Sequence, residues 1–303
     1  MVWLGVDMGG SASRWALADA TGKIIARGEA PGASALIGDM AARARFIDAL
    51  ASLRADLPEN PQGACLGLTG AGRNPGVALA TACAQPLGMD AARLRVMNDI
   101  TLAWHAAFGP KARAGHLLLA GTGSVGMGRG PKGAAVIGGR GALIDDAGSA
   151  VWIAQTALRV LYRRIDRYGR PQGCTSLAEA LYTAIGARDW DAVSARLYAA
   201  PRGEIGALAV AVAQAARDGD RVARGVLQGA QAELARLARR LVARCGKAPL
   251  ALAGGVLALD ASIKPGLAER LADLAPRFPR PDPAATGALM ALSDEQDRSG
   301  GRS

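Results

Sequence analysis

The chain opens on VWLGVDMGGS at residues 2–11, where an apolar run passes at once into the acidic, glycine-rich segment Asp7-Met8-Gly9-Gly10-Ser11. The apolar run predicts a short buried strand, and the paired glycines predict a tight turn whose bare backbone lets amide groups approach an anion. Ser11 adds a hydroxyl donor, and the carboxylate of Asp7 suits a hydrated Mg²⁺, which prefers oxygen ligands and keeps several of its waters. This segment, the first glycine turn, therefore predicts a phosphate site at a strand end.

Two further glycine turns follow apolar strands later in the chain. The second glycine turn, Gly121-Thr122-Gly123-Ser124, follows a strand expected at residues 117–119 and predicts another phosphate cradle, facing the first across a cleft. The third glycine turn, Gly254-Gly255, follows residues 250–253 and would let a flat adenosine lie against bare backbone. One such turn is usually only a tight connection between elements. Three of them, each at a strand end, favour nucleotide binding, and P-loop and Rossmann signatures do not occur.

The order of the predicted elements indicates two similarly built halves. Strands expected at 3–6, 14–19 and 23–29 form an antiparallel meander, and a helix at 37–56 and strands at 64–68 and 94–98 follow it. A second meander is expected from the strands at 117–119, 125–129 and 134–137. Residues 149–245 are expected to be mostly helical. Strands alternating with helices predict an α/β protein with parallel strands in its sheets.

Glycine and proline cluster at residues 109–113 and mark the predicted boundary between two domains. The expected division is an N-terminal domain at 1–112 and a C-terminal domain with a helical insertion at 113–283. A closing helix at about 284–293 is expected to return to the first domain, and the polar residues 294–303 are expected to form a disordered tail.

Composition narrows the classes of function. The formal net charge is +10, but the arginines are scattered or paired on helices, as at Arg163-Arg164 and Arg239-Arg240, which favours solvated helix faces over a nucleic-acid surface. The four cysteines lie far apart and there are only two histidines, so disulfide scaffolds and Cys/His zinc sites are not expected. No signal peptide or membrane span is predicted, and the cytoplasm is the expected compartment.

Taken together, the three glycine turns resemble those of the sugar kinase, heat-shock protein and actin superfamily, and more narrowly those of the N-acetylglucosamine kinase and BadF-type ATPase group. The resemblance runs from residue 2 to about residue 292 and includes the following motifs: Asn98-Asp99, Gly138-Gly139-Arg140-Gly141, Asp145-Asp146-Ala147-Gly148-Ser149 and residues 283–292. It implies two ribonuclease-H-like (actin-like ATPase) domains with an interdomain cleft. It also implies ATP and Mg²⁺ as cofactors, and adds Arg14 to the ATP-binding residues.

The resemblance also assigns roles at the substrate. An aspartate that matches Asp99 acts in this family as general base on the sugar hydroxyl, and phosphoryl transfer needs one such group. A helix cap is the other reading of Asp99. Asp146 matches an aspartate that binds sugar hydroxyls, and Gly139 is expected beside it. Arg140 replaces the tryptophan of N-acetylglucosamine kinases, as in similar bacterial glucosamine kinases. It is expected either to orient Asp146 or a neighbour, or to form a surface ion pair.

The resemblance to these kinases predicts an ATP-dependent amino-sugar kinase that phosphorylates the 6-hydroxyl of glucosamine, with N-acetylglucosamine as the alternative substrate. Ala147 replaces a family glutamate, and residues 32–35 lack the family's sugar-binding asparagine. The identity of the substrate sugar therefore stays open. Another class is a BadF-type ATPase activator that carries an iron–sulfur cluster on paired cysteines, which the dispersed cysteines disfavour. A non-catalytic ATP-binding regulator would not need Asp99. The expected partners are ATP and an amino sugar, with a homodimer left open.

Overall fold

The computed structural model describes residues 1–72 and 75–300, and the chain divides into two compact units. Unit 1 comprises Met1–Ala112 and Pro281–Ser303, and unit 2 comprises Arg113–Arg280. The division between Ala112 and Arg113 falls at the glycine- and proline-rich boundary in the sequence. Each unit is built on its own sheet with helices, so the predicted α/β fold class is confirmed.

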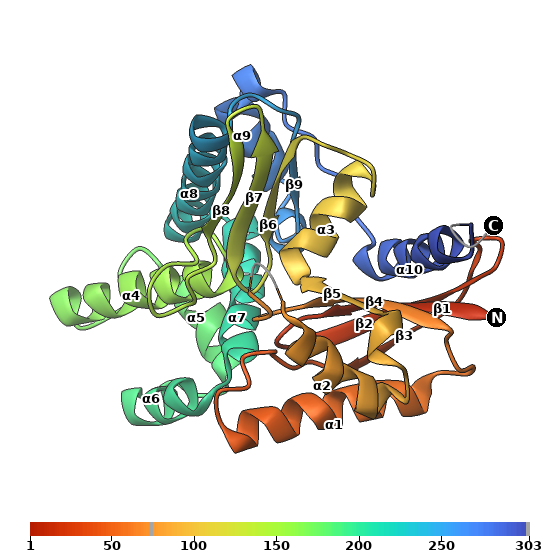
Figure 1. Ribbon diagram of the computed structural model, residues 1–303. Coiled ribbons are helices and arrows are strands. Elements are labelled where there is room, and N and C mark those ends of the chain that lie inside the picture. The colour runs from red at the N-terminus through yellow and green to blue at the C-terminus, as the bar shows by residue number, and fades with distance from the viewer. Residues whose placement is uncertain (73–74, 301–303) are drawn as a thin grey trace. The chain divides into compact units, whose positions relative to one another are not determined.

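Unit 1 is built on a five-stranded sheet in the order β3-β2-β1-β4-β5 (Figure 1). Its strands are β1 (Val2–Met8), β2 (Ala12–Asp19), β3 (Ile24–Pro31), β4 (Gly63–Leu68) and β5 (Leu94–Asn98). The first three form an antiparallel meander, and β4 and β5 run parallel to β1. Every residue of β1 except Asp7 is buried, because it is the central strand, whereas β3 alternates between exposed and half-buried residues at the edge.

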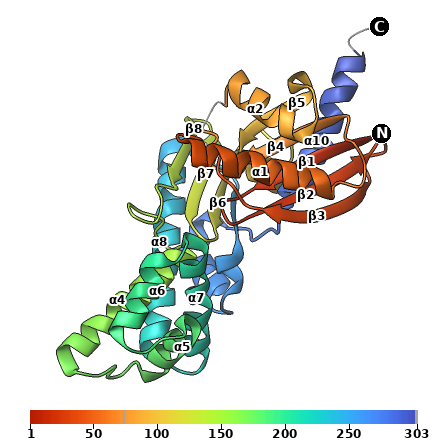
Figure 2. The ribbon, with the colours of Figure 1, turned by 90° about the horizontal axis from the view of Figure 1, so that it is seen from below.

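Helices cover both faces of this sheet. They are α1 (Met40–Asp56), α2 (Val77–Leu87), α3 (Asp99–Phe108) and α10 (Pro283–Gly300), with a 3₁₀ turn η1 (Ala91–Arg93) before β5. Helices α1 and α2 lie on one face, and α3 and α10 lie on the other (Figures 1 and 2). Helix α1 begins at Met40, three residues later than the sequence predicted, because the side chain of Asp39 caps it by accepting the amide of Ala42 at 2.7 Å.

Helix α10 brings the end of the chain against β1 through a contact between two glycines. Gly5 and Gly287 face each other so closely that a Cβ on Gly287 would lie 3.1 Å from the Cα of Gly5. The helix continues through Gly300, where the sequence predicted a disordered tail from residue 294. In this last part of the helix, Asp294 pairs with Arg95 of β5 at 3.1 Å. Residues 301–303 lie outside the described part.

Unit 2 repeats the three-stranded meander in a sheet with one strand fewer. Its strands are β6 (Gly115–Ala120), β7 (Ser124–Gly130), β8 (Gly133–Gly138) and β9 (Leu250–Ala253), in the order β8-β7-β6-β9. The first three are antiparallel, and β9 runs parallel to β6. The long helix α8 (Arg221–Cys245) packs against β6, β7 and β8. The meander of unit 2 thus has the same strand directions as the meander of unit 1.

The remaining helices of unit 2 lie between β8 and β9 in the chain or follow β9. They are α4 (Ala150–Tyr168), α5 (Thr175–Ile185), α6 (Trp190–Ala199), α7 (Arg202–Arg217) and α9 (Ile263–Arg270), with 3₁₀ turns η2 (Gly255–Ala258) and η3 (Ala272–Leu274). Buried Asp220 joins two helices, because it caps α8 and also accepts the amide of Leu177 in α5 at 3.0 Å. None of the helices in the described part is both long and apolar enough to cross a membrane.

The contact between β1 and α10 makes a stability prediction. A Cβ on Gly5 would lie 1.9 Å from the carbonyl oxygen of Ala284 and 2.2 Å from the amide nitrogen of Ala288, both of them backbone atoms. Gly5→Ala should therefore push α10 away from the sheet and cost about 3 kcal/mol of unfolding free energy, or more. Calorimetric unfolding measures this loss.

Gly38→Ala is the matched control, because a Cβ at Gly38 meets nothing within 4 Å. It should change the unfolding free energy by less than about 0.5 kcal/mol. Equal stability of the two variants would show that α10 does not pack on Gly5 as described.

Candidate active site

Asp7 lies near the carboxyl end of β1, directly across from Arg14 on the antiparallel neighbour β2. The pKa of Asp7 is raised from 3.8 to about 6, mainly by burial, then by the negative charge of Asp99 and to a smaller extent by that of Asp282. The positive charge of Arg14 lowers it but does not offset the other effects. Asp7 therefore sits in a place where negative charge is under-compensated, and a cation would stabilise its ionised form.

The first glycine turn is held in shape by its own backbone. The amide of Gly9 donates to the carbonyl of Ala12 at 3.0 Å, so it is engaged within the turn. Gly32 packs against the turn so closely that a Cβ there would lie 2.4 Å from the amide nitrogen of Ala12. Gly10 and Ser11 are exposed, and a Cβ on Gly10 would meet nothing within 4 Å. The open side of the predicted phosphate site is thus at Gly10 and Ser11.

Asp99 begins α3 at the end of β5, and both of its carboxylate oxygens have partners. Oδ2 accepts the hydroxyl of Thr69 at 2.5 Å, and Oδ1 accepts the amide of Ile100 at 2.8 Å. The cap of α3 is Asn98, whose side chain also accepts the amide of Ile100. Asp99 is therefore not the N-cap residue, which was the alternative reading of this aspartate, although it shares the amide with Asn98.

Parallel strand pairing brings these residues to one edge of the sheet. Met8 of β1 is paired with Leu68 of β4, and Leu68 with Asn98 of β5, so the residues after each strand lie at the same edge. Thr69 was missed by the sequence reasoning. The sequence feature that could have identified Thr69 is its position immediately after a buried strand and before a glycine.

In unit 2, the second glycine turn is joined to the start of α4. The carbonyls of Gly121 and Thr122 accept the amides of Ala150 and Val151, at 2.9 and 3.3 Å, and the amide of Gly121 donates within the turn to Gly123 at 2.9 Å. Among the hydrogen bonds of the described residues, none uses the amides of Thr122 and Gly123. These two amides are the ones that the turn can offer to an anion.

Ser124 was predicted to bind ATP, but its hydroxyl is directed into unit 2. Its side chain is buried, and its hydroxyl donates to the carbonyl of Ala147 at 2.8 Å. Gly139 also donates its amide to the carbonyl of Ser124 at 2.8 Å. Ser124 thus ties the second glycine turn to the loop of residues 139–148, which carries the predicted sugar residues.

Asp146 is the most constrained residue of that loop. It is 1% exposed and has a φ of 61°, which is unusual for a residue with a side chain. Its Oδ2 accepts a hydrogen bond from Nη2 of Arg202, the first residue of α7. Arg140 is exposed, and no hydrogen bond or ion pair of the described residues involves it. Arg140 was expected to orient Asp146 or a neighbour, but the arginine that contacts Asp146 is Arg202. The sequence did not indicate Arg202.

The third glycine turn adjoins the second, because β9 and β6 are parallel neighbours. Gly254 has a φ of 113°, and a Cβ there would lie 2.3 Å from the carbonyl oxygen of Ala120, so both conformation and space require glycine. Gly255 starts a 3₁₀ turn, and a Cβ on it would meet nothing within 4 Å. The uncovered backbone that was expected to contact an adenosine is therefore at Gly255.

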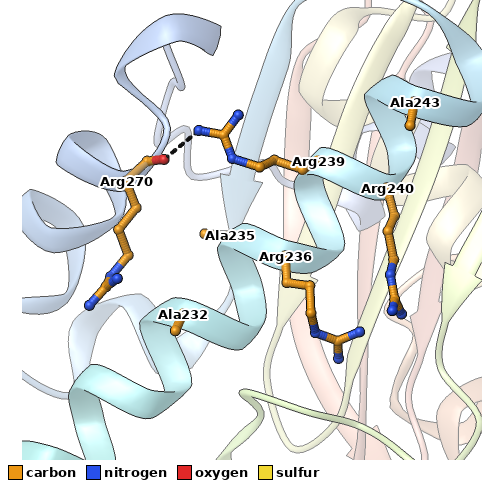
Figure 3. A pocket seen from close by; sticks show the side chains of 7 residues that line it. All are labelled: Ala232, Ala235, Arg236, Arg239, Arg240, Ala243 and Arg270. Carbon is orange, nitrogen blue, oxygen red and sulfur yellow. Dashed lines mark hydrogen bonds between the residues drawn. The ribbon is translucent and has the colours of Figure 1, made fainter.

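A groove on the surface of unit 2 contains none of these residues. It lies along α8 and α9 and is lined by Ala232, Ala235, Arg236, Arg239, Arg240, Ala243 and Arg270 (Figure 3). Arg239 is engaged there, because its guanidinium donates to the carbonyl of Arg270 at 2.8 Å and to both carboxylate oxygens of Asp273. Arg236 pairs with Glu233. The groove is separate from the predicted site, whose unit 2 residues lie on the glycine turns and the loop of residues 139–148.

A search of curated protein sequences finds no match, but solved structures do match. The chain is similar to a provisionally named N-acetylglucosamine kinase from Chromobacterium violaceum, with 28% identity, a TM-score of 0.75, and coverage of 96% of this chain and 98% of that one. A ROK family glucokinase from Streptomyces griseus, in complex with glucose and AMPPNP, is 16% identical, with a TM-score of 0.57 and coverage of 97% and 99%. An activator of the 2-hydroxyisocaproyl-CoA dehydratase from Clostridium difficile, with bound ADPNP, is 13% identical, with a TM-score of 0.51 and coverage of 99% and 97%.

The last two likenesses concern the fold alone, and with the first they confirm the predicted fold of actin-like sugar kinases. The model of the BadF/BadG/BcrA/BcrD ATPase family matches residues 4–290, nearly the whole length of the chain. This match agrees with the resemblance seen in the glycine turns. The chain belongs to the BadF/BadG/BcrA/BcrD ATPase family.

Proposed function

We propose that this protein is an ATP-dependent amino-sugar kinase that transfers the γ-phosphate of ATP to the 6-hydroxyl of glucosamine. The observation that carries the proposal is the carboxylate of Asp99, held by Thr69 and by the amide of Ile100 at the edge of the sheet where β1, β4 and β5 end. Membership of an ATPase family and the 28% identity to a provisionally named N-acetylglucosamine kinase support it.

Asp99 is the proposed general base. Phosphoryl transfer depends on positioning, on neutralisation of charge and on a group that accepts the proton of the attacking hydroxyl. The two hydrogen bonds fix the orientation of the Asp99 carboxylate and leave each oxygen a further lone pair for the sugar hydroxyl. Thr69 thus acts through Asp99 as a positioning residue.

Asp7 is proposed to bind Mg²⁺ through a water molecule. No three His, Cys, Asp or Glu side chains of the described residues are grouped to hold a metal by themselves. A single partly buried carboxylate with a raised pKa fits an ion that keeps most of its waters and takes its other ligands from phosphates. When bound there, Mg²⁺ would neutralise the charge of the nucleotide phosphates.

The nucleotide is proposed to use the open parts of the three glycine turns. In the first, Gly10 and Ser11 offer exposed backbone and a hydroxyl, with Gly9 and Arg14 beside them. In the second, the amides of Thr122 and Gly123 are available, and Gly121 and Ser124 shape the turn around them. In the third, the adenosine would lie on Gly254 and Gly255.

The amino sugar is proposed to meet the loop of residues 139–148. Asp146 is the candidate for the sugar hydroxyls. Asp145 is half-buried and accepts only the amide of Ala147 among the hydrogen bonds of the described residues, so its negative charge has no ion pair. This charge suits the ammonium of glucosamine better than a neutral N-acetyl group, since an ion pair would form only with the ammonium.

N-acetylglucosamine is the second candidate substrate, and the name of the 28% identical structure favours it. An activator that carries an iron–sulfur cluster on cysteines between subunits is disfavoured by a different observation. All four cysteines, Cys65, Cys83, Cys174 and Cys245, are completely buried. Burial also raises the pKa of Cys65 and Cys83 to about 12, so neither thiolate is available to a metal at a surface.

The role of Asp99 makes a kinetic prediction. Asp99→Asn should keep AMPPNP affinity within about threefold and lower kcat on glucosamine by about 10²–10⁴-fold, because an amide cannot accept the hydroxyl proton. A coupled assay of ADP release measures the rate. Asp56→Asn, on an exposed residue of α1, is the matched control and should leave kcat unchanged. A kcat within threefold of wild type for Asp99→Asn would remove Asp99 from the mechanism.

The raised pKa of Asp7 makes a prediction about pH. The folded protein holds this proton until about pH 6, whereas the unfolded chain releases it near 3.8. This contribution to stability is therefore present below about pH 4 and is lost as pH rises through 6, by about 3 kcal/mol. In EDTA, the unfolding free energy of wild type should fall by this amount relative to Asp7→Asn between pH 4 and 7. A difference that does not change with pH would contradict the buried carboxyl.

The substrate proposal is tested by comparing two sugars. Wild type should prefer glucosamine over N-acetylglucosamine in kcat/KM by at least about tenfold, or about 1.4 kcal/mol of transition-state binding. Asp145→Asn should narrow this ratio because it removes the charge that meets the ammonium. Asp166→Asn, on an exposed residue of α4, is the control and should leave the ratio unchanged. If wild type prefers N-acetylglucosamine, the second candidate replaces the first.

A further inference from the structure

Arg202 lies between Asp146 and the second glycine turn, both of which belong to unit 2. Its guanidinium donates from Nη2 to the carboxylate of Asp146, whose side chain is only 2% exposed. The side chain of Arg202 is itself 48% exposed, so part of the guanidinium remains open. A guanidinium has five N–H donors, and the contact with Asp146 uses one nitrogen.

The guanidinium also lies against the second glycine turn. A Cβ on Gly123 would be 2.1 Å from Nη2 of Arg202 and 2.9 Å from Oδ2 of Asp146. A side chain on Gly123 would displace the guanidinium of Arg202 from this position. The amides of Thr122 and Gly123, which no hydrogen bond among the described residues uses, lie on the same short turn. Backbone donors and a cation are therefore brought together at Gly123.

The start of α7 is held against this turn by packing. Gly206 lies one helical turn after Arg202, and a Cβ there would be 3.4 Å from Cγ2 of Thr122. The position is unfavourable for an arginine in terms of helix stability, because the amino-terminal end of a helix carries a partial positive charge. Pro201 gives the helix no capping side chain, and Glu204 in the first turn forms no ion pair with Arg202 among the described residues. Helix stability thus does not explain the arginine.

We infer that Arg202 binds the terminal phosphate of the nucleotide, together with the amides of Thr122 and Gly123. The inference rests on the proposed function, because it takes ATP as ligand and Asp146 as a sugar residue. Asp146 holds one side of the guanidinium, and the open donors face the phosphate. The terminal phosphate is assigned because it must lie beside the sugar hydroxyl, and Arg202 is in contact with the proposed sugar carboxylate.

The test is nucleotide affinity as a function of phosphate number. AMPPNP, ADP and adenosine are titrated by calorimetry, with excess Mg²⁺ and without sugar, into wild type, Arg202→Met and Arg202→Lys. Arg202→Met should weaken AMPPNP binding by at least about tenfold and ADP and adenosine binding by less than about threefold. Arg202→Lys should be intermediate, because an ammonium keeps the charge but has no fork of donors. Arg163→Met, on an exposed arginine of α4, is the control and should match wild type.

A double variant separates phosphate binding from a role in merely holding Asp146. If Arg202 acts only by holding Asp146, adding Arg202→Met to Asp146→Asn will not weaken AMPPNP binding further. If Arg202 contacts the phosphate, the added change will still cost at least about fivefold. The double variant also removes the unpaired buried carboxylate, so it remains informative if Arg202→Met alone does not fold.

The results also separate this inference from the proposed function. If wild type binds AMPPNP but does not phosphorylate an amino sugar, the proposed function fails, and the affinity series still tests Arg202. If wild type phosphorylates glucosamine and Arg202→Met binds AMPPNP as tightly as wild type does, the inference about Arg202 is overturned alone. Equal losses for AMPPNP, ADP and adenosine would also overturn it, because they would indicate a purely structural role.

Discussion

Parallel pairing of the strands next to each meander is the constraint on which the rest of the structure depends. In unit 1, β4 and β5 run parallel to β1, so the residues after Met8, Leu68 and Asn98 come to one edge. In unit 2, β9 runs parallel to β6, so the second and third glycine turns are neighbours. Strand pairing within each sheet thus brings together the candidate site residues and the glycine turns of that unit, although they are far apart in the sequence.

The two units carry opposite electrostatic arrangements. In unit 1, Asp7 and Asp99 lie close enough for the charge of Asp99 to raise the pKa of Asp7, and Arg14 does not offset it. In unit 2, buried Asp146 is already neutralised by Arg202, whose guanidinium keeps an open side. The first arrangement suits the cation that we propose for it, and the second suits the proposed anion. The proposed magnesium-bound nucleotide carries charge of both signs, so each arrangement matches one part of it.

The elements and turns could be predicted from the sequence because their signals are local. Apolar runs that end in turn-forming or acidic residues predicted each strand of the described part, and only the strand ends differ, as where β2 begins at Ala12 rather than at residue 14. The contacts within the site could not be predicted in this way. Arg202 and Asp146 are 56 residues apart, and Thr69 meets Asp99 across 30 residues. Such pairs depend on strand register and helix packing, which no short segment specifies. The inward hydroxyl of Ser124 is a further case.

The placement of the arginines helps to separate those that stabilise helices from those with another role. Arg217, Arg244 and Arg270 lie in the last turns of their helices, where a cation is favoured by the helix dipole. Arg239 adds a donor to the carbonyl of Arg270 and binds Asp273, which holds α8 to the end of α9.

Part of the excess positive charge therefore has a local structural explanation. Arg221 begins a helix, but it directly follows the capping carboxylate of Asp220. Arg202 begins a helix without such a cap, and its acidic partner is a buried residue of another loop. A cation at the start of a helix gains nothing from the helix dipole, so the contact of Arg202 with a strained, buried aspartate is better explained by the proposed site than by the helix.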